Sequence, residues 1–507
     1  MMDSSTIFLS LTVGLFAIYY FFVKESFFNR HGIPHLKPFS FIWSMISMLV
    51  FRKSSFHDDM KNIYCMNENA KYIGLYHTSA PTILIRDLEL IKNITIKNFD
   101  SFTDHGGFAD PEHEPLFGKN LFFLRGKKWR ETRNLLSPAF TLSKMKSMFK
   151  LMSDCAETFS NSIGAQCVDH EMEYDAKDIF TRYTNDTIAT CAFGVAVDSM
   201  KVPNNEFYVL GRRATDLNGL NAIKMFVVKL FPTLTKIIGL KIVDAEVEKF
   251  FFTLVSDTIV TRTEQGITRP DVIQLMMEAR DHKDNSKTLD LSIESMTSQA
   301  FVFFFGGFES TATLMCFVAH HLSIFPKVQR KLQDEIDQVM TNCNGEPTYE
   351  SVNNMEYLDA IINETLRLYP INPAMDRVCT KSFELPPSLP ESKPTMLKPG
   401  DTIWYPIAAM HRDPKYFPHP DEFDPERFIG DARAENNFNA YLPFGLGPRM
   451  CIGNRFALLE VKVLFLHLLT KFNITPGERM ILPLRLSKKT INYMAEGGFW
   501  VNLKPRK

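Results

Sequence analysis

A loop near the end of the chain has the residue types to hold a reactive thiol. Residues 444–453 read FGLGPRMCIG, so Cys451 lies among three glycines, one proline and one arginine. The apolar segment that follows directly, IGNRFALLEVKVLFLHLLTKF, predicts a helix beginning next to the thiol. The positive end of a helix dipole favours a thiolate, and the free N–H groups there can donate to sulfur. Gly447 and Gly453 allow the backbone to approach a flat ligand, and Pro448 stiffens the turn.

A thiolate in this setting suits either a nucleophile or the axial bond to a haem iron. A cysteine nucleophile requires a general base and an oxyanion site, and neither has a local motif near Cys451. A haem requires cations for its propionates, and Arg449 is already adjacent to the thiol. The loop therefore favours haem binding.

A long apolar segment in the centre of the chain carries a second polar group. Ser292 is suited to cap a helix that runs to about Phe325. The pair Gly306-Gly307 interrupts it. Each interior glycine costs about 1 kcal/mol relative to alanine, so the backbone there must approach another group or bend. An acid and two hydroxyls follow: Glu309, Ser310 and Thr311. Close helix packing by the glycines, and hydroxyls bonded back to the helix, explain these residues equally well.

A third segment, about Met355 to Leu368, pairs an acid with a base. The sequence ETLR places Glu364 and Arg367 three residues apart on one helix face. Such pairs are common on protein surfaces, where they contribute little to stability. The apolar residues around this pair indicate that it is partly buried, where it requires further partners.

Composition limits the class of protein. The chain has 507 residues and is 45% hydrophobic, enough for a large globular core. Its 57 Lys and Arg against 58 Asp and Glu give a net charge of −1, so no nucleic-acid partner is expected. The eight cysteines form no CxxC pair, which argues against structural zinc. The 44 phenylalanines indicate either an apolar ligand cavity or a phenylalanine-rich core.

Apolar periodicity predicts a mainly α fold with small β-sheets. Strand signals are confined to two regions. Residues 71–86 predict a hairpin with its turn near Ser79 to Pro81, and residues 481–503 predict short C-terminal strands. The one candidate internal linker, residues 381–400, contains five prolines. We expect it to be a surface excursion, because the chemistry-bearing residues lie on both sides of it.

The N-terminus predicts a membrane anchor. Ile7 to Val23 is 17 residues without a charge, at the short end of the range that spans a bilayer. A cleaved signal would begin with basic residues, whereas Asp3 precedes this run. Lys24, Arg30 and Lys37 follow it and place the rest of the chain in the cytosol, whereas a buried helix explains them poorly. The predicted organisation is a transmembrane anchor (1–23), a proline-containing linker (24–38) and one large domain (39–507).

Five short motifs occur in an order that resembles the microsomal cytochromes P450 over nearly the whole chain. The loop matches that family's haem-binding FxxGxRxCxG pattern at Phe444, Gly447, Arg449, Cys451 and Gly453. The other four are WRETR at 129–133, GGFEST at 306–311, ETLR at 364–367 and PERF at 425–428. EPLFGKN, LSPAF, RVCTKSF and GGFW further resemble the insect xenobiotic-metabolising members. The resemblance implies the P450 fold, mainly helical with small sheets, and one haem b.

The resemblance also implies roles for individual residues. Cys451 would be the metal ligand, through its thiolate. The loop residues around the ligand would be Phe444, Gly447, Arg449 and Gly453. The propionates would be held by Trp129, Arg133, Arg377 and Arg449. A buried network that fixes the Cys451 loop would consist of Glu364, Arg367 and Arg427. The catalytic residues that activate oxygen would be Glu309 and Ser310, with Thr311 as the alternative hydroxyl. The family usually has threonine at position 310, and serine lacks the β-branch that restricts χ1.

The implied activity is an NADPH- and O2-dependent haem-thiolate monooxygenase acting on lipophilic small molecules, either xenobiotics or endogenous lipids and hormones. Substrate contacts are expected from residues 101–117 and 371–375 and from the phenylalanines of the central helix. The side chains concerned are Phe117, Phe301, Phe304, Phe305, Phe308, Ala374 and Met375. Residues 223–240, basic and apolar, are expected to dip into the bilayer.

The implied electron donor is NADPH-cytochrome P450 reductase, with cytochrome b5 as a further candidate, at the cytosolic face of the endoplasmic reticulum. The expected docking residues are Lys127, Lys128 and Arg130. Two other classes stay open: a haem-thiolate isomerase or dehydratase that rearranges peroxides without external electrons, and a non-catalytic haem-binding protein. The acid and hydroxyl at Glu309 and Ser310 argue against the isomerase.

Overall fold

The computed structural model describes residues 27–37, 53–77, 80–107, 110–167, 170–216, 218–269, 271–281, 291–488 and 493–506. The predicted anchor at residues 1–23 lies outside the described residues, as do residues 24–26 and 38 of the predicted linker.

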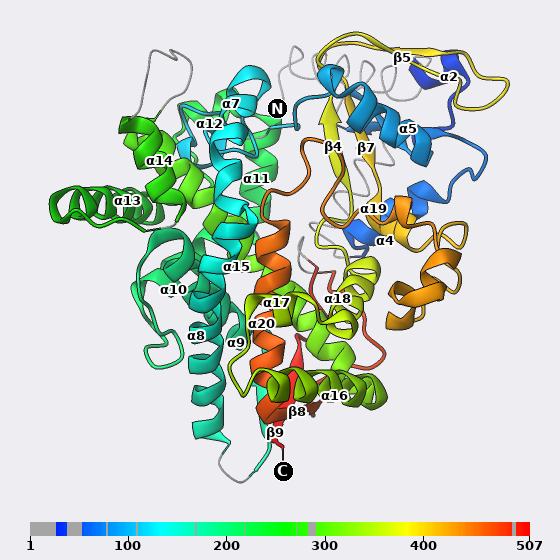
Figure 1. Cartoon of the computed structure of the whole chain (residues 1–507). Helices are drawn as coiled ribbons and strands as arrows, with labels where there is room; N and C mark the ends of the chain where they lie inside the picture. Colours follow the sequence, from blue (N-terminus) through cyan, green and yellow to red (C-terminus); the bar gives the residue numbers. More distant parts are fainter. Residues whose placement is uncertain are drawn as a thin grey trace, which may run out of the picture.

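The described chain is mainly helical with small sheets, as predicted (Figure 1). Its α-helices are α2 (Phe27–His31), α4 (Phe56–Tyr64), α5 (Leu88–Lys92), α6 (Pro115–Gly118), α7 (Gly126–Leu136), α8 (Leu142–Gln166), α9 (Ala176–Ile188), α10 (Glu206–Thr215), α11 (Leu220–Leu230), α12 (Pro232–Ile237), α13 (Ala245–Gln265), α14 (Val272–Asp281), α15 (Ile293–Ile324), α16 (Pro326–Asn342), α17 (Tyr349–Asn353), α18 (Glu356–Leu368), α19 (Ile407–His411) and α20 (Asn454–Lys471). Its strands are β1 (Tyr72–His77), β2 (Ala80–Ile85), β3 (Met172–Asp175), β4 (Met375–Val378), β5 (Phe383–Leu385), β6 (Thr395–Leu397), β7 (Thr402–Tyr405), β8 (Phe472–Pro476) and β9 (Trp500–Pro505).

Helix α15 lies at the centre of the helical part of the molecule (Figure 1). The Ser292 side chain caps it by accepting the N–H of Ser295, which confirms the predicted start. The helix packs against α6, α9, α10, α13, α18 and α20. Among the described helices, α15 alone is long and apolar enough to cross a membrane, but most of its apolar part is buried inside the molecule. It is therefore the core helix that positions its neighbours.

A four-stranded sheet lies beside the helical part, with α2, α4 and α5 nearby (Figure 1). Its strand order is β1-β2-β7-β4, with β2 and β7 parallel and the other two pairs antiparallel. The predicted hairpin at residues 71–86 is confirmed as β1 and β2, although Ala80 and Pro81 belong to β2 and not to the turn. Strands β4 and β7 have four residues each, too short for a periodic signal, and the sequence did not predict them.

The predicted C-terminal strands at residues 481–503 are wrong for most of that range. The second sheet consists of β3, β9 and β8, and only β9 overlaps the prediction. In the described residues between Ile481 and Phe499 the pairing is limited to an isolated bridge that joins Leu486 to Ala495. Tyr493 and Phe499 are buried in the main core, and Leu484, Leu486 and Met494 pack against it.

The proline-rich segment 381–400 is a surface hairpin packed on the large sheet, so the predicted surface excursion is confirmed. Strands β5 and β6 pair within it. The Ser388 hydroxyl donates to the Tyr72 carbonyl over 2.6 Å, and the Tyr72 hydroxyl donates to the Pro386 carbonyl over 2.9 Å. These bonds hold the segment against β1, because buried polar groups require partners.

Two hydrophobic cores meet at the segment that leads into the Cys451 loop. The larger core surrounds α15, and a smaller one lies at the four-stranded sheet. Ala440 and Leu442 are buried in the sheet core, whereas Phe444 and Ile452 pack against the helical core. The loop therefore lies between the sheet part and the helical part of the molecule.

Candidate functional site

The loop at residues 444–453 has a shape that only glycine permits at position 447. Gly447 has a φ of +77°, and a Cβ there would overlap the carbonyl oxygen of Thr95. The Cys451 N–H donates to the Phe444 carbonyl over 2.9 Å, and the Met450 N–H donates to the Gly447 carbonyl over 2.9 Å. These two bonds fold the loop back on itself and fix the backbone of the thiol.

The Cys451 side chain is accessible to solvent although it lies deep in the molecule. The residue has the accessible surface of an exposed side chain, yet burial raises the pKa of its thiol. A side chain with both properties borders an internal hollow instead of the outer surface. The Gly453 N–H and the Arg133 guanidinium lower this pKa, but by less than burial raises it.

The predicted helix follows the thiol closely: α20 begins at Asn454, three residues after Cys451. Desolvation raises the pKa of the thiol more than the Gly453 N–H and Arg133 lower it. Coordination to a metal ion removes a thiol proton outright, which makes the hollow suited to a ligand role more than to a free nucleophile.

Two of the predicted arginines contact the Cys451 loop directly. Arg133 of α7 donates from Nη2 to the Met450 carbonyl over 2.9 Å. Arg377 of β4 is fully buried and reaches the Leu446 carbonyl from Nη2 over 3.4 Å. The structure thus brings helix α7 and strand β4 to the same loop.

Arg449 and Trp129 form a second contact on the same side. The Arg449 guanidinium lies 4.1 Å from the centre of the Trp129 ring, and both side chains are buried. Arg449 donates from Nε to the Thr103 carbonyl and from Nη2 to the Leu124 carbonyl, each over 2.7 Å. Burial lowers its pKa, and the nearby charges of other arginines lower it further.

The positive groups near the loop have few anionic partners. The Nε of buried Arg377 has no hydrogen-bond partner among the described residues. Arg449 forms one ion pair, with Asp104 at 3.6 Å. A carboxylate ligand would supply the missing acceptor and relieve the repulsion between guanidinium groups. The arginines, the accessible thiol and the close backbone at Gly447 together fit a haem with its propionates.

His105 and Asp376 belong to this cluster, and the sequence did not predict them. His105 Nδ1 lies 2.8 Å from Asp376 Oδ1, and the Gly106 N–H donates to Asp376 Oδ2. Burial lowers the pKa of His105, against the opposing effect of Asp376. The adjacent sequence DR at 376–377 was the available signal, but nothing local connects it to a histidine about 270 residues earlier.

The two adjacent glycines of α15, Gly306 and Gly307, have different structural surroundings. A Cβ at Gly307 would lie 2.5 Å from the Ile188 side chain, so this glycine permits close packing of α15 on α9. A Cβ at Gly306 would meet no atom within 4 Å. The packing explanation therefore holds for Gly307, whereas Gly306 borders an open volume.

Ser310 and Thr311 face different surroundings. Ser310 lies one turn after Gly306 on the same face, and its hydroxyl donates to the Gly306 carbonyl. Thr311 is buried, and its hydroxyl forms no hydrogen bond of standard geometry among the described residues. It lies close enough to the Glu460 carboxyl to lower the pKa of that group, although burial raises this pKa much more. Thr311 therefore faces α20, away from the open face of Gly306.

Glu309 is held by an ion pair that the sequence did not predict. Lys177 of α9 lies 2.8 Å from Glu309 Oε1 and also donates to the Glu309 carbonyl over 3.2 Å. The Lys177 ammonium further contacts the Thr313 hydroxyl over 2.8 Å. In this conformation the acid is directed at α9 and bonds to Lys177, with no bond to Ser310.

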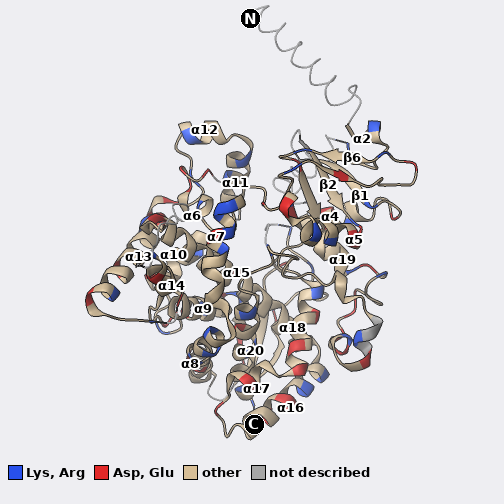
Figure 2. Ribbon diagram, turned by 45° about the horizontal axis from the view of Figure 1, so that its top comes forward, with Lys and Arg blue, Asp and Glu red and all other residues tan. Residues whose placement is uncertain are grey.

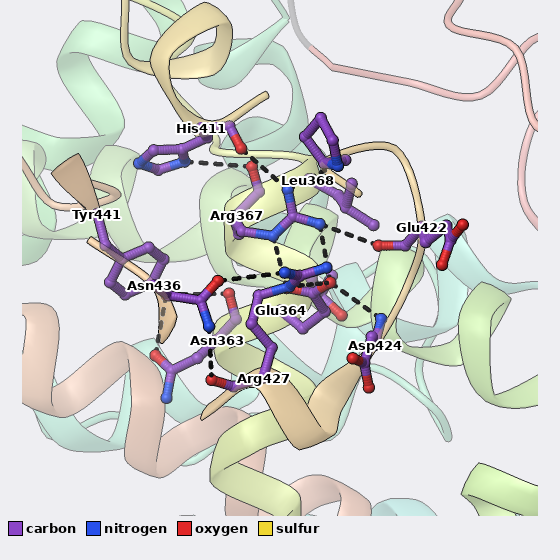
Figure 3. A network of polar contacts seen from close by, with 12 residues as sticks. Asn363, Glu364, Arg367, Leu368, His411, Glu422, Asp424, Arg427, Asn436 and Tyr441 are labelled. Atoms are coloured by element: carbon purple, nitrogen blue, oxygen red, sulfur yellow. Dashed lines mark hydrogen bonds and ion pairs between the residues drawn. The ribbon is translucent and has the colours of Figure 1, made fainter. Parts of the chain in front are cut away.

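Glu364, Arg367 and Arg427 come together in a buried network (Figure 3). Arg367 binds both oxygens of Glu364, at 2.6 and 2.8 Å. The Asp424 N–H donates to the same carboxylate over 2.9 Å, and Arg427 Nε lies 3.5 Å from it. The remaining donors of both arginines bind carbonyls and side chains within residues 411–436. The network therefore anchors that segment and does not bond to residues 444–453 directly.

Most of the predicted substrate phenylalanines belong to the core. Phe301, Phe304 and Phe308 are fully buried, and Phe117 is 3% exposed. The ring of Phe304 lies 5.2 Å from that of Phe251, in an aromatic cluster with α13. The spacing 301, 304 and 308 is a core-facing stripe, so these side chains do not reach open volume. Among the central phenylalanines predicted for substrate, Phe305 remains half-buried. Ala374 and Met375 are also half-buried, directly before Asp376.

The fold and the site together are those of a haem-thiolate protein: a mainly helical chain, an accessible thiol in the interior and arginines directed at its loop. The sequence model of the family described as Cytochrome P450 matches residues 34–494. Cytochrome P450 9e2 of Blattella germanica is 42% identical, over 95% of this chain and 94% of the relative. Probable cytochrome P450 9f2 of Drosophila melanogaster is 38% identical, over 95% and 96%, and cytochrome P450 6j1 of Blattella germanica is 34% identical, over 96% and 95%. The chain belongs to the cytochrome P450 family and is a P450 monooxygenase, an oxidoreductase.

Proposed function

We propose that the protein is an NADPH- and O2-dependent monooxygenase of lipophilic small molecules, with Cys451 as the axial ligand of haem b. The observation that carries the proposal is the Cys451 thiol, accessible in the interior beside Arg133 and on a loop that Arg377 also contacts. The haem, when bound, supplies the binding and activation of O2, and the thiolate donates electron density to it.

The chain's own residues would hold the haem propionates, limit the volume open to substrate and supply protons. Arg377 and Arg449 would bind the propionates, because Arg377 has a buried donor without a hydrogen-bond partner among the described residues and Arg449 belongs to the Cys451 loop itself. Gly306 and Cys451 would border the same hollow, with the Ser310 hydroxyl on its wall. Glu309 would exchange its bond with Lys177 for a proton path to Ser310. Phe305 and Met375 would limit the volume open to substrate.

The protein would be anchored in the endoplasmic reticulum through residues 7–23, with its domain in the cytosol. The membrane contact proposed for residues 223–240 is supported by large apolar side chains that are more than half exposed: Phe231, Leu234, Ile237 and Ile238. These side chains lie in and beside α12, which projects at one end of the molecule (Figure 2). Electrons would come from NADPH through cytochrome P450 reductase, with cytochrome b5 as a further donor.

A panel of lipophilic compounds in reconstituted membranes tests the proposal. Product should form only with NADPH and purified reductase present together, and NADPH consumption should rise with substrate. The family assignment does not favour a haem-thiolate isomerase or dehydratase, which would rearrange a peroxide with no NADPH. Turnover independent of NADPH would support that alternative.

The Ser310 hydroxyl, not that of Thr311, is expected to control the coupling of oxygen reduction to product. Ser310→Ala should keep NADPH consumption while diverting several-fold more reduced oxygen to hydrogen peroxide, because the hydroxyl on the open face of α15 is lost. Thr311→Ala should remain better coupled, since Thr311 faces Glu460. The measurement is product and peroxide per NADPH in both variants.

Peroxide leakage confined to Thr311→Ala would reverse this assignment. Tight coupling in both variants would remove the hydroxyls from proton delivery. Thr297→Ala is a suitable control, because Thr297 lies on the same helix, is buried, and among the described residues its hydroxyl bonds only back to the Ile293 carbonyl over 2.7 Å.

Reversing the charge of Lys127, Lys128 and Arg130 is expected to slow reduction by the reductase about tenfold at low salt. All three side chains are exposed on α7, the helix whose Arg133 contacts the Cys451 loop. Arg130 pairs with Asp100 at 2.8 Å, which leaves part of the patch neutralised. Stopped-flow reduction over a range of salt concentrations measures the effect.

Peroxide-driven turnover should be unchanged in this triple variant, because that reaction does not use the donor protein. Lys327→Glu with Arg330→Glu is the matched control, since both residues are exposed on α16, well apart from α7 (Figures 1 and 2). Equal slowing in the control would show that docking does not depend on the α7 patch.

A further inference from the structure

His411 connects helix α18 to the segment that enters the Cys451 loop. It is the last residue of α19 and is fully buried. Its Nδ1–H donates to the Arg367 carbonyl over 3.1 Å, and its Nε2 accepts the N–H of Leu442 over 2.8 Å. Leu442 lies two residues before Phe444. One imidazole thus joins the end of α18 to the start of the loop; Figure 3 shows its bond to the Arg367 carbonyl.

The protonation state of the His411 ring determines which of its two nitrogens donates a hydrogen bond and which accepts one. Burial, and secondly the charge of Arg367, lower the pKa of His411 to about 3. The ring is therefore neutral in any working buffer, with one donor and one acceptor. Because a carbonyl can only accept, Nδ1 carries the proton, and Nε2 presents its lone pair to Leu442.

His411 and Arg367 bond to each other twice, each donating to the backbone carbonyl of the other. Arg367 donates from Nη1 to the His411 carbonyl over 2.9 Å, while the His411 ring donates to the Arg367 carbonyl. Tyr441 stacks on the His411 ring at 5.4 Å, and its hydroxyl donates to the Asn363 side chain over 2.9 Å. Two consecutive residues are therefore held in place: Tyr441 by Asn363 of α18, and Leu442 by His411.

The connection matters because the Glu364 network stops short of the loop. Its described bonds end within residues 411–436, and residues 444–453 contain three glycines with few side chains to anchor them. We propose that His411 is a positioning residue that sets the placement of the axial thiolate by holding Leu442 to α18. This inference rests on the proposed role of Cys451 as the haem ligand.

The test uses the full-length, haem-loaded enzyme and three variants of His411. His411→Asn can replace the bond to Arg367 but is too short to reach Leu442. His411→Gln can place an acceptor near the position of Nε2. His411→Phe keeps ring packing and removes both bonds. The readouts are the lifetime of the red-shifted Soret band of the reduced carbon monoxide complex and the reduction potential.

His411→Asn and His411→Phe are expected to shorten the lifetime of that band about tenfold, because the buried Leu442 N–H loses its acceptor. His411→Gln should remain within about threefold of the unmodified enzyme. All three effects should be the same from mildly acidic to mildly alkaline pH, because the ring is neutral throughout.

His321→Asn is the matched control. His321 is buried, its pKa is lowered to about 3, and its Nδ1 bonds to the Phe317 carbonyl of its own helix over 2.7 Å. This variant should lose thermal stability without a change in band lifetime or potential. Equal shortening in His321→Asn and His411→Asn would overturn the proposal, since general destabilisation would then explain both.

An unchanged band lifetime in His411→Asn would also overturn it. If His411→Asn yields no haem-loaded protein, His411→Gln decides: a lifetime near that of the unmodified enzyme supports the proposal, and a tenfold loss contradicts it. A native enzyme without the red-shifted band would instead refute the ligand role of Cys451, so the two failures are distinguishable.

Discussion

Cys451→Ser is expected to abolish the red-shifted Soret band of the reduced carbon monoxide complex completely. A serine hydroxyl remains protonated where a cysteine thiol ionises on metal binding, so the electron-donating axial bond is lost. NADPH-dependent product formation should fall to background for the same reason. The measurements are the reduced carbon monoxide spectrum and haem content per chain.

Two other cysteines serve as controls for this variant. Cys65 is exposed and Cys316 is buried, so serine at either position tests a general effect of the substitution. Both variants should keep the band. A full red-shifted band in Cys451→Ser would refute the whole assignment of the site.

Arg367→Lys is expected to cost about 2–6 kcal/mol of the free energy of unfolding, because at least two buried acceptors lose their donor at about 1–3 kcal/mol each. The Arg367 guanidinium makes five bonds: two to the Glu364 carboxylate and one each to the carbonyls of His411, Pro420 and Glu422. Lysine has three donors in a different geometry and leaves carbonyls unpaired. Such a loss is a large share of a typical stability of about 5–15 kcal/mol, so little haem-loaded protein should accumulate.

Chemical denaturation, with haem content per chain, checks the Arg367 prediction. Arg213→Lys is the control, because Arg213 pairs with Asp244 and Glu246 on the surface and is 44% exposed. That variant should lose less than about 1 kcal/mol. If Arg367→Lys is as stable as Arg213→Lys, the network is not a structural requirement.

The long helices could be predicted because their signals are local. The helix at Ile293–Ile324 has a capping serine and an apolar pattern that continues on both sides of the glycine pair, and the structure confirms its bounds. The helices at Glu356–Leu368 and Asn454–Lys471 are likewise close to their predicted ranges. Strands β4 to β7 have three or four residues each, too short for a periodic signal. Strand β7 also pairs with β2, more than 300 residues earlier in the chain, which no local pattern reveals.

The phenylalanines of the central helix could not be assigned to core or cavity from the sequence pattern. A helix with apolar residues on most of its surface does not reveal which face meets a neighbour and which borders a cavity. The packing of α10 and α13 decides that Phe304 is core, while Phe305, the next residue, stays half-buried. The same packing separates Gly307, pressed against Ile188, from Gly306, which has open space.

The sequence by itself determined that a thiol lies on a glycine-rich loop directly before an apolar helix, and that an acid and two hydroxyls follow a glycine pair. Those features depend on neighbours within about ten residues, which spacing and propensity describe. The tertiary structure alone decided the pairing of Lys177 with Glu309, of His105 with Asp376 and of His411 with Leu442. These contacts join residues from 31 to 271 positions apart, and burial determines their energies, so no local pattern contains them.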